Sequence, residues 1–441
     1  MYGKILTRRE ATLKAGILTM FNGLDKTYSL VNVVAEHLNM LLAAGIQTKL
    51  LVSEDCSDHE RTGIYADNRI EWVKIKNHLQ KRQIKWYDYS QPDGVLHDSF
   101  FQEADVISKD YVENLFDVDV CILHDIHYQG WHLVHNIALR KAQEKLPQVR
   151  FLAFTHSLPV NPPPQLKWPF SARYTAMPRT VYVYPSSSGI PALARQFNIP
   201  EGKCRIVNNS FDITADMSKD IQNLCCKNDL LSPDILIVYP ARLTPGKQFE
   251  KLAAFAGAIK KRTELHIKVV FCDFPSMDID PVKYKQEIQS AGNSFGLNEG
   301  DLCFTSDLGY PAGFPHSSVL ELFTLSNLFV CPSYSESFGL TVLEAAGRGN
   351  FIVLNQAVPA LEELGKMLQA YYMRWNARNF GFDSREIYHP SEQAYLEEHA
   401  EKVVALMREN PVVHAKTLVR RRFSPQWIWR NQFEPLLGNE K

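Results

Sequence analysis

The chain has 441 residues, which is more than one hydrophobic core usually holds, so two or three domains are expected. Hydrophobic residues make up 45% and charged residues 22%, the composition of an ordinary soluble globular protein. Because 48 Lys and Arg residues balance 49 Asp and Glu residues, the net charge gives no indication of a nucleic-acid partner, and no apolar run is long enough to span a bilayer.

Two further features concern the cellular compartment. The segment MYGKILTRREATLKAGILTMF interleaves charged and apolar side chains and lacks the apolar core of a signal peptide. Four of the eight cysteines lie in apolar, strand-like runs such as VDVCILHD and LFVCPS, where reduced core residues are expected. The adjacent pair at 225–226 lacks the spacing of a zinc site. We therefore expect a cytoplasmic chain with no cysteine-bound metal.

The first half alternates strands with helices. The sequence predicts a strand over 15–21, a turn at NGLDK, a helix over TYSLVNVVAEHLNMLLAAG and a second strand over 47–54. Strand, glycine turn, helix and strand together form a βαβ unit of a parallel sheet. Further Val- and Ile-rich runs predict strands at 117–125, 149–156, 180–187 and 204–210.

The second half repeats this alternation. Residues 213–234 are polar and contain turn residues, which is typical of a linker. A strand over 235–243, a helix over 247–262 and a strand over 265–273 follow, and DLCFTSD, LFVCPSY and NFIVLNQ continue the series. We thus expect an acceptor-side domain over 1–212 joined by a C-terminal helix at 425–441, a linker over 213–234 and a second domain over 235–424. That final helix carries Trp427, Trp429 and Phe433 and is expected to pack on a core.

Residues 331–350, CPSYSESFGLTVLEAAGRGN, contain Glu336 and Glu344 eight positions apart. Gly339 favours a tight turn, and TVLEAA favours a helix that starts near Leu340. The N–H groups of Phe338, Gly339 and Leu340 would then suit a phosphate or a hydroxyl, while each carboxylate can accept hydrogen bonds from hydroxyls. Taken alone, the spacing also fits one exposed loop glutamate and one glutamate on a helix face.

The stretch ELFTLSNLFVCPSYSESFGLTVLEAAGRG resembles the signature of glycosyltransferase family 4, the retaining glycosyl transferases of group 1. The resemblance implies an α/β GT-B fold, in which two Rossmann-like domains face each other across a cleft and a C-terminal helix crosses back to the first. It also implies that Glu336 contacts the donor sugar and Glu344 the ribose of the nucleotide. Phe338, Gly339 and Leu340 would belong to the same nucleotide site.

A second motif is VYPARLTPGKQFEKL, which is similar to the R-L-x-P-x-K element of the same family. There the Arg and the Lys, here Arg242 and Lys247, neutralise the leaving diphosphate. The physical chemistry agrees, because two cations and a helix start meet at one place. Without the glutamate motif, the pair would be interpreted as solvated charges at the end of a strand.

The resemblance places the acceptor side in the first half. Gly23 of NGLDKTYS matches the family's glycine-rich first loop, whose backbone amides approach the nucleotide-sugar donor, although Leu24 replaces the usual second glycine. His156 in FLAFTHSLP lies where the family often has a histidine near the reacting carbon. Residues at the end of another strand are further candidates for the acceptor pocket: His124, Asp125, His127 and Tyr128. A histidine at a strand end is otherwise a packed, hydrogen-bonded group.

Other segments depart from the family pattern or allow two interpretations. Ser210 replaces a glycine of the family in IVNNSFD. VVFCDFPSM and AVPALEE each replace a glycine-containing turn of the family, and these two changes are expected to alter the pocket for the base or the sugar. Residues 71–89 mix basic and aromatic side chains; a solvated edge strand and loop is preferred over a surface for an anionic polymer or lipid. In the proline-rich loop 161–180, a candidate lid, Trp168, Phe170 and Tyr174 would stack on a sugar or cover a core.

The expected function is metal-independent, retaining transfer of a sugar from a UDP- or GDP-sugar to a hydroxyl of a glycan, lipid, polymer or small molecule. No cofactor or nucleic-acid partner is expected, and peripheral membrane contact stays open. The expected catalytic residues are Arg242, Lys247, Glu336 and His156.

Three alternatives remain. The first is a non-catalytic GT-B partner that binds carbohydrate, and the second is a sugar-nucleotide epimerase or phosphorylase on the same fold. A phosphorylase would need a pyridoxal-binding lysine context, which we do not find in the sequence. The third is a hydride-transferring enzyme, which would need G-x-G-x-x-G after the first strand, and FNGLDK does not supply it.

Overall fold

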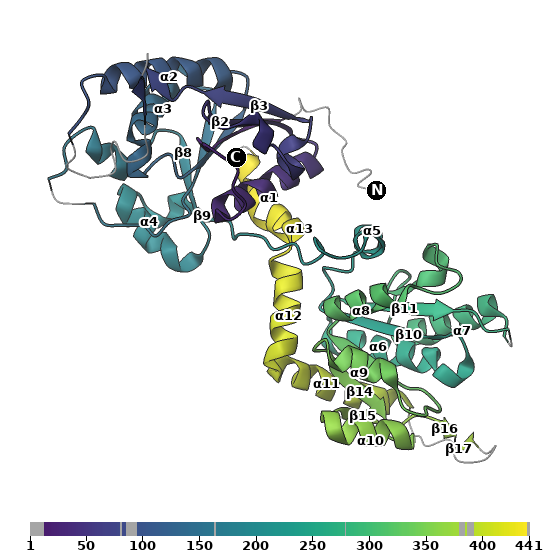
Figure 1. Ribbon diagram of the computed structural model, residues 1–441. Coiled ribbons are helices and arrows are strands. Elements are labelled where there is room, and N and C mark those ends of the chain that lie inside the picture. Colours follow the sequence, from purple (N-terminus) through teal and green to yellow (C-terminus); the bar gives the residue numbers. More distant parts are fainter. Residues whose placement is uncertain are drawn as a thin grey trace. The chain divides into compact units, whose positions relative to one another are not determined.

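The computed structural model describes residues 13–79, 82–84, 95–162, 165–277, 279–378, 384–385 and 392–438. These residues form two compact units (Figure 1). We call residues 13–210 together with 425–438 the N-terminal unit, and residues 211–424 the C-terminal unit. Each unit has its own parallel sheet and its own hydrophobic core, so each is described by itself.

The N-terminal unit is built on a seven-stranded sheet with the order β3-β2-β1-β6-β7-β8-β9, in which all neighbouring strands are parallel. The strand order reverses at β1, which lies between β2 and β6. In open α/β sheets ligands bind outside the carboxyl ends of the strands at such a point. The strands are β1 (Lys14–Leu18), β2 (Gln47–Ser53), β3 (Ile70–Ile75), β6 (Val120–His124), β7 (Arg150–Phe154), β8 (Thr180–Tyr184) and β9 (Cys204–Ile206).

Helices cover both faces of this sheet. Successive side chains of a strand point to opposite sides, so neighbouring residues of one strand belong to different apolar clusters. Leu18 of β1 belongs to one apolar cluster, together with α2 (Phe100–Leu115), α3 (Leu133–Lys145) and α4 (Ile190–Phe197). Ile17 belongs to the other, together with α1 (Ser29–Ala43) and the C-terminal segment. That segment comprises α13 (Pro425–Ile428), a π-helical turn (Trp429–Phe433) and α14 (Glu434–Leu437), and Figure 1 shows it beside α1.

The C-terminal unit has a six-stranded sheet with the order β12-β11-β10-β13-β14-β15, also parallel throughout. Its strands are β10 (Ile235–Arg242), β11 (Ile267–Phe274), β12 (Leu302–Phe304), β13 (Leu328–Cys331), β14 (Phe351–Asn355) and β15 (Tyr371–Met373). Its helices are α5 (Lys219–Asn228), α6 (Phe249–Thr263), α7 (Pro281–Ser294), α8 (His316–Leu325), α9 (Leu340–Ala346), α10 (Pro359–Leu368), α11 (Glu392–Glu409) and α12 (Pro411–Arg422). There are also two short antiparallel pairs: β16 (Ala377–Arg378) with β17 (Ser384–Arg385) in this unit, and β4 (His78–Leu79) with β5 (Arg82–Gln83) in the N-terminal unit.

These two parallel sheets confirm the predicted α/β class with two Rossmann-like halves, and the C-terminal segment lies in the core of the first half as expected. One expectation needs correcting. The segment 213–234 is more than a linker, because it contains α5, whose Ile221, Leu224 and Cys225 are buried in the C-terminal core. The polar residues that suggested a linker are the exposed face of this helix and its cap, where the Ser218 hydroxyl accepts a hydrogen bond from the Ile221 N–H.

The described part of the segment 71–89 begins as the edge strand β3, and residues 80–81 and 85–89 lie outside the described residues. All eight cysteines are free, and Cys226 is exposed while the other seven are buried. Among the described residues, each helix is too short or too polar to cross a membrane.

The contact between α6 and the end of α7 leaves no room for an added methyl group. A Cβ at Gly257 would lie 2.8 Å from Phe295 Cβ and 2.9 Å from the Gly292 carbonyl oxygen. We expect Gly257→Ala to lower the free energy of unfolding by about 1–3 kcal/mol through overpacking, measured by chemical denaturation. Gly202→Ala is the matched control, since a Cβ there meets no atom within 4 Å; equal stability of the two variants would contradict the packing.

Candidate functional site

Two loops at the carboxyl edge of the C-terminal sheet are joined directly. One follows β10 and the other follows β13, and these strands are neighbours. The Tyr334 N–H donates to the Gly246 carbonyl at 2.8 Å. The buried Tyr239 hydroxyl donates to the Lys247 carbonyl at 2.9 Å and is hydrogen-bonded to Ser333 Oγ at 3.1 Å. The Arg/Lys motif and the first glutamate motif therefore share one hydrogen-bonded frame.

This frame brings Lys247 and Glu336 into contact. Lys247 Nζ donates to Glu336 Oε1 in an ion pair whose side chains are 29% and 20% exposed. Arg242, the last residue of β10, is exposed, and its side chain has no hydrogen-bond or ion-pair partner among the described residues. The C-terminal unit thus holds two cations and a carboxylate. Lys247, which was predicted to bind the diphosphate, contacts Glu336, which was predicted to bind the donor sugar.

Gly339 makes the turn between the two glutamates, and α9 begins at Leu340 as predicted. Its φ of 93° lies in the left-handed region, and a Cβ would lie 3.2 Å from both Leu361 and Val342, so glycine is required for two reasons. The N–H groups of Phe338, Gly339 and Leu340 have no hydrogen-bond partner within the described residues.

Glu344 has a partner that sequence reasoning missed. Its Oε1 lies 2.8 Å from His316 Nε2, and the two side chains are 14% and 70% exposed. His316 is the first residue of α8. In the loop before it, Gly313 has a φ of 115°, and a Cβ at this position would lie 3.3 Å from Phe274 Cβ. No sequence motif marks this histidine, which lies 28 positions before Glu344 in the chain.

Two buried amides that the sequence analysis also missed hold the loops in place. Gln248 Nε2 donates to the Pro332 carbonyl at 2.6 Å and to the Asn376 carbonyl at 2.9 Å. Asn355 Nδ2 donates to the Ser333 carbonyl at 3.1 Å. An amide at the end of an apolar strand, as in NFIVLNQ, is the signal that could have indicated this supporting role.

The turn in VVFCDFPSM, which departs from the family pattern, is built around a buried carboxylate. Asp273, 1% exposed, accepts hydrogen bonds from the Ser306 N–H at 3.0 Å and from the Ser306 hydroxyl at 2.5 Å. Lys285 Nζ lies 3.6 Å from the same carboxylate. These three residues line a cavity of about 840 Å³, and residues of β12 and α7 also line it.

The N-terminal unit contains a cavity of about 510 Å³ at the carboxyl ends of β1 and β6. His124 and Asp125, two of the predicted acceptor-side residues, line it together with Gly23, which was predicted to approach the donor. His156 is not among its lining residues, but His156 Nε2 lies 2.8 Å from His124 Nδ1 and the two rings stack with centroids 5.1 Å apart. His156 is thus connected to the cavity wall through His124.

The loop that carries Gly23 is held by Glu60. The Leu24 N–H donates to Glu60 Oε2 at 2.6 Å, and a Cβ on Gly23 would lie 2.9 Å from that same oxygen. The amide of Leu24, the residue that replaces the second family glycine, is therefore used inside the protein. A larger residue at position 23 would require the Glu60 carboxylate to move.

Two other acceptor-side candidates point into the core. His127 is fully buried, with Nε2 2.8 Å from Thr155 Oγ1, and Tyr128 is 5% exposed. Of the aromatic residues in the proline-rich loop, Phe170 packs in the core while Trp168 is 54% exposed.

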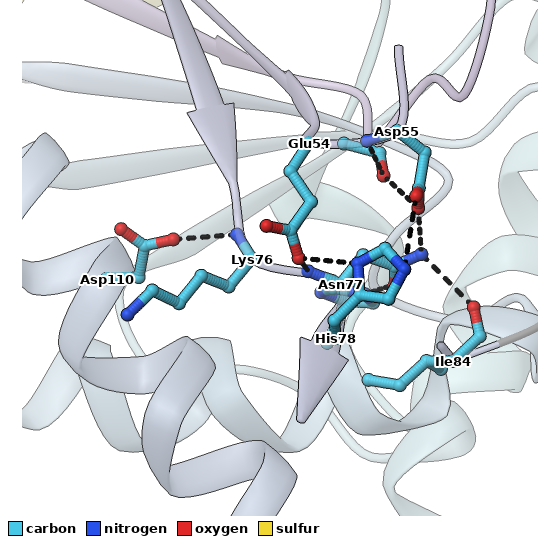
Figure 2. Close-up of polar contacts among 9 residues, drawn as sticks. Glu54, Asp55, Lys76, Asn77, His78, Ile84 and Asp110 are labelled. Carbon is cyan, nitrogen blue, oxygen red and sulfur yellow. Dashed lines mark hydrogen bonds and ion pairs between the residues drawn. The ribbon is translucent and has the colours of Figure 1, made fainter. Parts of the chain in front are cut away.

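A polar cluster lies beside the cavity, where β2 and β3 end (Figure 2). Glu54 Oε1 accepts from the Asn77 N–H at 2.5 Å and lies 2.9 Å from His78 Nδ1. Asn77 Nδ2 donates to Asp55 Oδ2 at 2.8 Å and to the Ile84 carbonyl at 3.1 Å. Asn77 also lines the cavity, so this cluster fixes part of its wall.

Burial keeps six histidines of the N-terminal unit neutral near pH 7. It lowers the pKa of His37, His127 and His135 to about 3, the pKa of His132 and His156 to about 4, and that of His124 well below its usual value. Within the described residues, no group of three or more His, Cys, Asp or Glu side chains could hold a metal ion.

These pKa shifts predict that the protein loses stability on mild acidification. The unfolded chain binds protons near pH 6.5 that the six folded-state histidines bind only below about pH 4, so stability falls as pH falls through this window. Asp125 acts in the opposite direction, because burial raises its pKa to about 6, but it is one group against six. Denaturation midpoints between pH 7 and pH 4.5 check this, and a constant or rising stability would contradict it.

Comparison with known proteins gives one sequence match and several structural ones. Residues 226–370 match the family model for "Glycosyl transferases group 1". No curated protein matches the chain.

Three of the similar solved structures come from bacteria. A glycosyltransferase from Rickettsia africae has 14% identity, a TM-score of 0.36 and coverage of 97% of this chain and 98% of its own. HepE of Anabaena in complex with UDP has 14% identity, a TM-score of 0.35 and coverage of 96% and 99%. A UDP-forming trehalose-phosphate synthase from Burkholderia xenovorans has 13% identity, a TM-score of 0.36 and coverage of 97% and 99%.

All three TM-scores are below 0.5, so the fold assignment rests on the chain's own two parallel sheets. The family match covers the C-terminal unit from the last residues of α5 to just past α10. Residues 226–370, which contain Arg242, Lys247, Glu336 and Glu344, are therefore similar to the group 1 glycosyl transferases.

Proposed function

We propose that this protein is a retaining glycosyltransferase of family 4 that transfers a sugar from a UDP- or GDP-sugar to an acceptor hydroxyl. One observation carries the proposal: within the stretch that matches group 1 glycosyl transferases, Lys247 contacts Glu336 at the sheet edge where β10 ends in Arg242. This arrangement offers cations for a diphosphate and a carboxylate for sugar hydroxyls at one place.

In the proposed reaction the bond between the anomeric carbon and the diphosphate oxygen breaks, and a bond from that carbon to the acceptor oxygen forms on the same face. The acceptor proton passes to the departing phosphate oxygen, so no protein nucleophile is needed. Negative charge develops on the diphosphate, where Arg242 and Lys247 stabilise it most in the transition state. These two cations supply the positive charge, and the proposed transfer therefore requires no metal ion.

Glu336 and Glu344 would hold hydroxyl groups of the donor. Lys247 now occupies one oxygen of Glu336, and His316 occupies one oxygen of Glu344. A carboxylate has about four acceptor positions, so each glutamate keeps room for a sugar or ribose hydroxyl while its partner fixes its orientation. The free N–H groups of Phe338, Gly339 and Leu340 add donors for phosphate oxygens. His156 would act from the N-terminal unit, near the reacting carbon.

Removing either member of the central ion pair should abolish most of the transfer. We expect Glu336→Ala and Lys247→Ala each to lower kcat/KM by at least ~100-fold, because both groups act on charge or hydroxyls in the transition state. The measurement is sugar transfer or slow hydrolysis across a panel of UDP- and GDP-sugars. Lys402→Ala, which removes an exposed helix ion pair to Glu398, is the matched control. Full activity of both site variants would refute the assignment.

Nucleotide binding should also be visible without turnover. UDP or GDP at about 100 times Kd should stabilise the protein by about 2.7 kcal/mol, and Arg242→Ala should reduce this effect because it removes a charge from the diphosphate site. Thermal unfolding with each nucleotide tests this point. Nucleotide binding in a protein that transfers no sugar to any acceptor would instead favour the non-catalytic carbohydrate-binding alternative.

A further inference from the structure

We propose that His124 is a positioning residue for His156. Its ring holds the ring of His156 in one neutral tautomer, in which Nε2 of His156 accepts a hydrogen bond from His124 and Nδ1–H of His156 is presented to the ligand. His156 would then donate a hydrogen bond to a sugar oxygen and would not remove a proton from it. The use of this hydrogen bond in sugar transfer rests on the proposed function, whereas the tautomer is inferred from the N-terminal unit alone.

The two rings are in direct contact beyond the neighbouring strands β6 and β7. His124 is the last residue of β6, and His156 lies two residues past the end of β7. His124 Nδ1 lies 2.8 Å from His156 Nε2, and the rings stack with an interplanar angle of 14°. One of these two nitrogens must carry a proton and the other must accept it, because two bare nitrogens or two N–H groups would repel each other at this distance.

Both rings are neutral near pH 7. Burial is the main cause: it lowers the pKa of His156 to about 4 and that of His124 well below its usual value. A neutral histidine has one N–H and one bare nitrogen. The direction of the hydrogen bond between the rings therefore also determines the state of the two outer nitrogens, Nε2 of His124 and Nδ1 of His156.

The surroundings of His124 Nε2 indicate which ring donates. His124 is 0% exposed, and its Nε2 is buried with no hydrogen-bond partner among the described residues. The rings of His37 and Phe154 pack against it, with centroids 5.2 and 5.5 Å away. A buried N–H without an acceptor is rarer in proteins than a buried acceptor without a donor. Nε2 of His124 is thus the bare nitrogen, its Nδ1–H donates, and the proton of His156 lies on Nδ1.

Nδ1 of His156 differs from Nε2 of His124 because it is accessible. His156 is partly exposed, and its Nδ1 has no hydrogen-bond partner among the described residues and is not one of the buried unpaired atoms. The lone pair of the ring is already used in the contact with His124, so the accessible side offers a donor and no base. This agrees with the proposed reaction, in which the acceptor proton passes to the departing phosphate.

The residue after His124 holds the main chain of His156. Asp125 Oδ1 accepts from the His156 N–H at 2.8 Å, and the Asp125 N–H donates to the Phe154 carbonyl at 3.1 Å. With a φ of 60°, Asp125 is a non-glycine residue in the left-handed region, as is Met20 with a φ of 52°. Such conformations are unfavourable and persist where the surrounding structure holds them. Two consecutive residues at the end of β6 therefore fix the ring and the main chain of His156.

NMR of the full chain labelled with ¹⁵N-histidine measures the tautomers without any substrate, because protonated and bare ring nitrogens differ widely in ¹⁵N chemical shift. We expect both His124 and His156 to carry the proton on Nδ1, with the His156 signals identified by their loss in His156→Gln. His124→Phe keeps an aromatic ring in the stack but removes the donor, so His156 should then also populate the Nε2–H form.

His37→Phe is the matched control for this measurement. It replaces another buried ring that packs against His124, and Nδ1 of His37 has no hydrogen-bond partner among the described residues. The tautomer of His156 should stay unchanged in this variant. A proton on Nε2 of His156 in the unmodified protein, or an Nδ1–H form that is unaltered in His124→Phe, would overturn the proposal.

Kinetics then distinguish positioning from packing. We expect His124→Phe to lower kcat for sugar transfer by ~10-fold and to leave Kd for the free nucleotide unchanged within about twofold, because the hydrogen bond concerns the sugar. His124→Asn, which offers an amide N–H near the position of Nδ1, should restore most of the loss. The double variant His124→Phe/His156→Gln should be no slower than His156→Gln alone within about twofold.

Losses that add fully in the double variant would contradict the positioning role, because His124 would then act independently of His156. Absence of transfer by the unmodified protein with every donor would count against the proposed function instead. In that case the NMR measurement still decides the tautomer.

Discussion

The ion pair between Lys247 and Glu336 is the contact on which the candidate site depends. The two residues are 89 positions apart, and they meet because β10 and β13 are parallel neighbours whose following loops leave the same edge of the sheet. A hydrogen bond from Tyr334 to Gly246 and the amide of Gln248 hold these loops together. The pair is partly buried, with 29% and 20% of its two side chains exposed.

The N-terminal unit places chemistry at the corresponding edge of its own sheet. Here the strand order reverses at β1, and a cavity opens between the ends of β1 and β6. The unit surrounds it with buried, neutral histidines and with two strained backbone positions. Burial of titratable groups and strained backbone both reduce stability, and the combination is characteristic of sites that bind ligands.

Each glutamate of the motif has a basic partner within the protein, and the two partners differ in how they could be foreseen. Lys247 belongs to a recognisable motif, so its approach to Glu336 could be anticipated from the order of the strands. His316 belongs to no motif, and its contact with Glu344 joins residues 28 positions apart in the chain. Similarly, Asn77 and Gln248 take part in the sites through hydrogen bonds to residues distant in sequence.

The sequence by itself determined the α/β class, most of the strands, the turn at Gly339 and the start of α9 at Leu340. These follow from local periodicity and from glycine's freedom at positive φ, which neighbouring residues suffice to indicate. It misjudged 213–234, because polar residues on one face of a helix resemble a linker until the buried face has a core to pack on. Only the tertiary structure decided which polar groups meet, which histidines are buried and neutral, and that the Leu24 amide binds Glu60, because burial and hydrogen-bond partners depend on residues far apart in the chain.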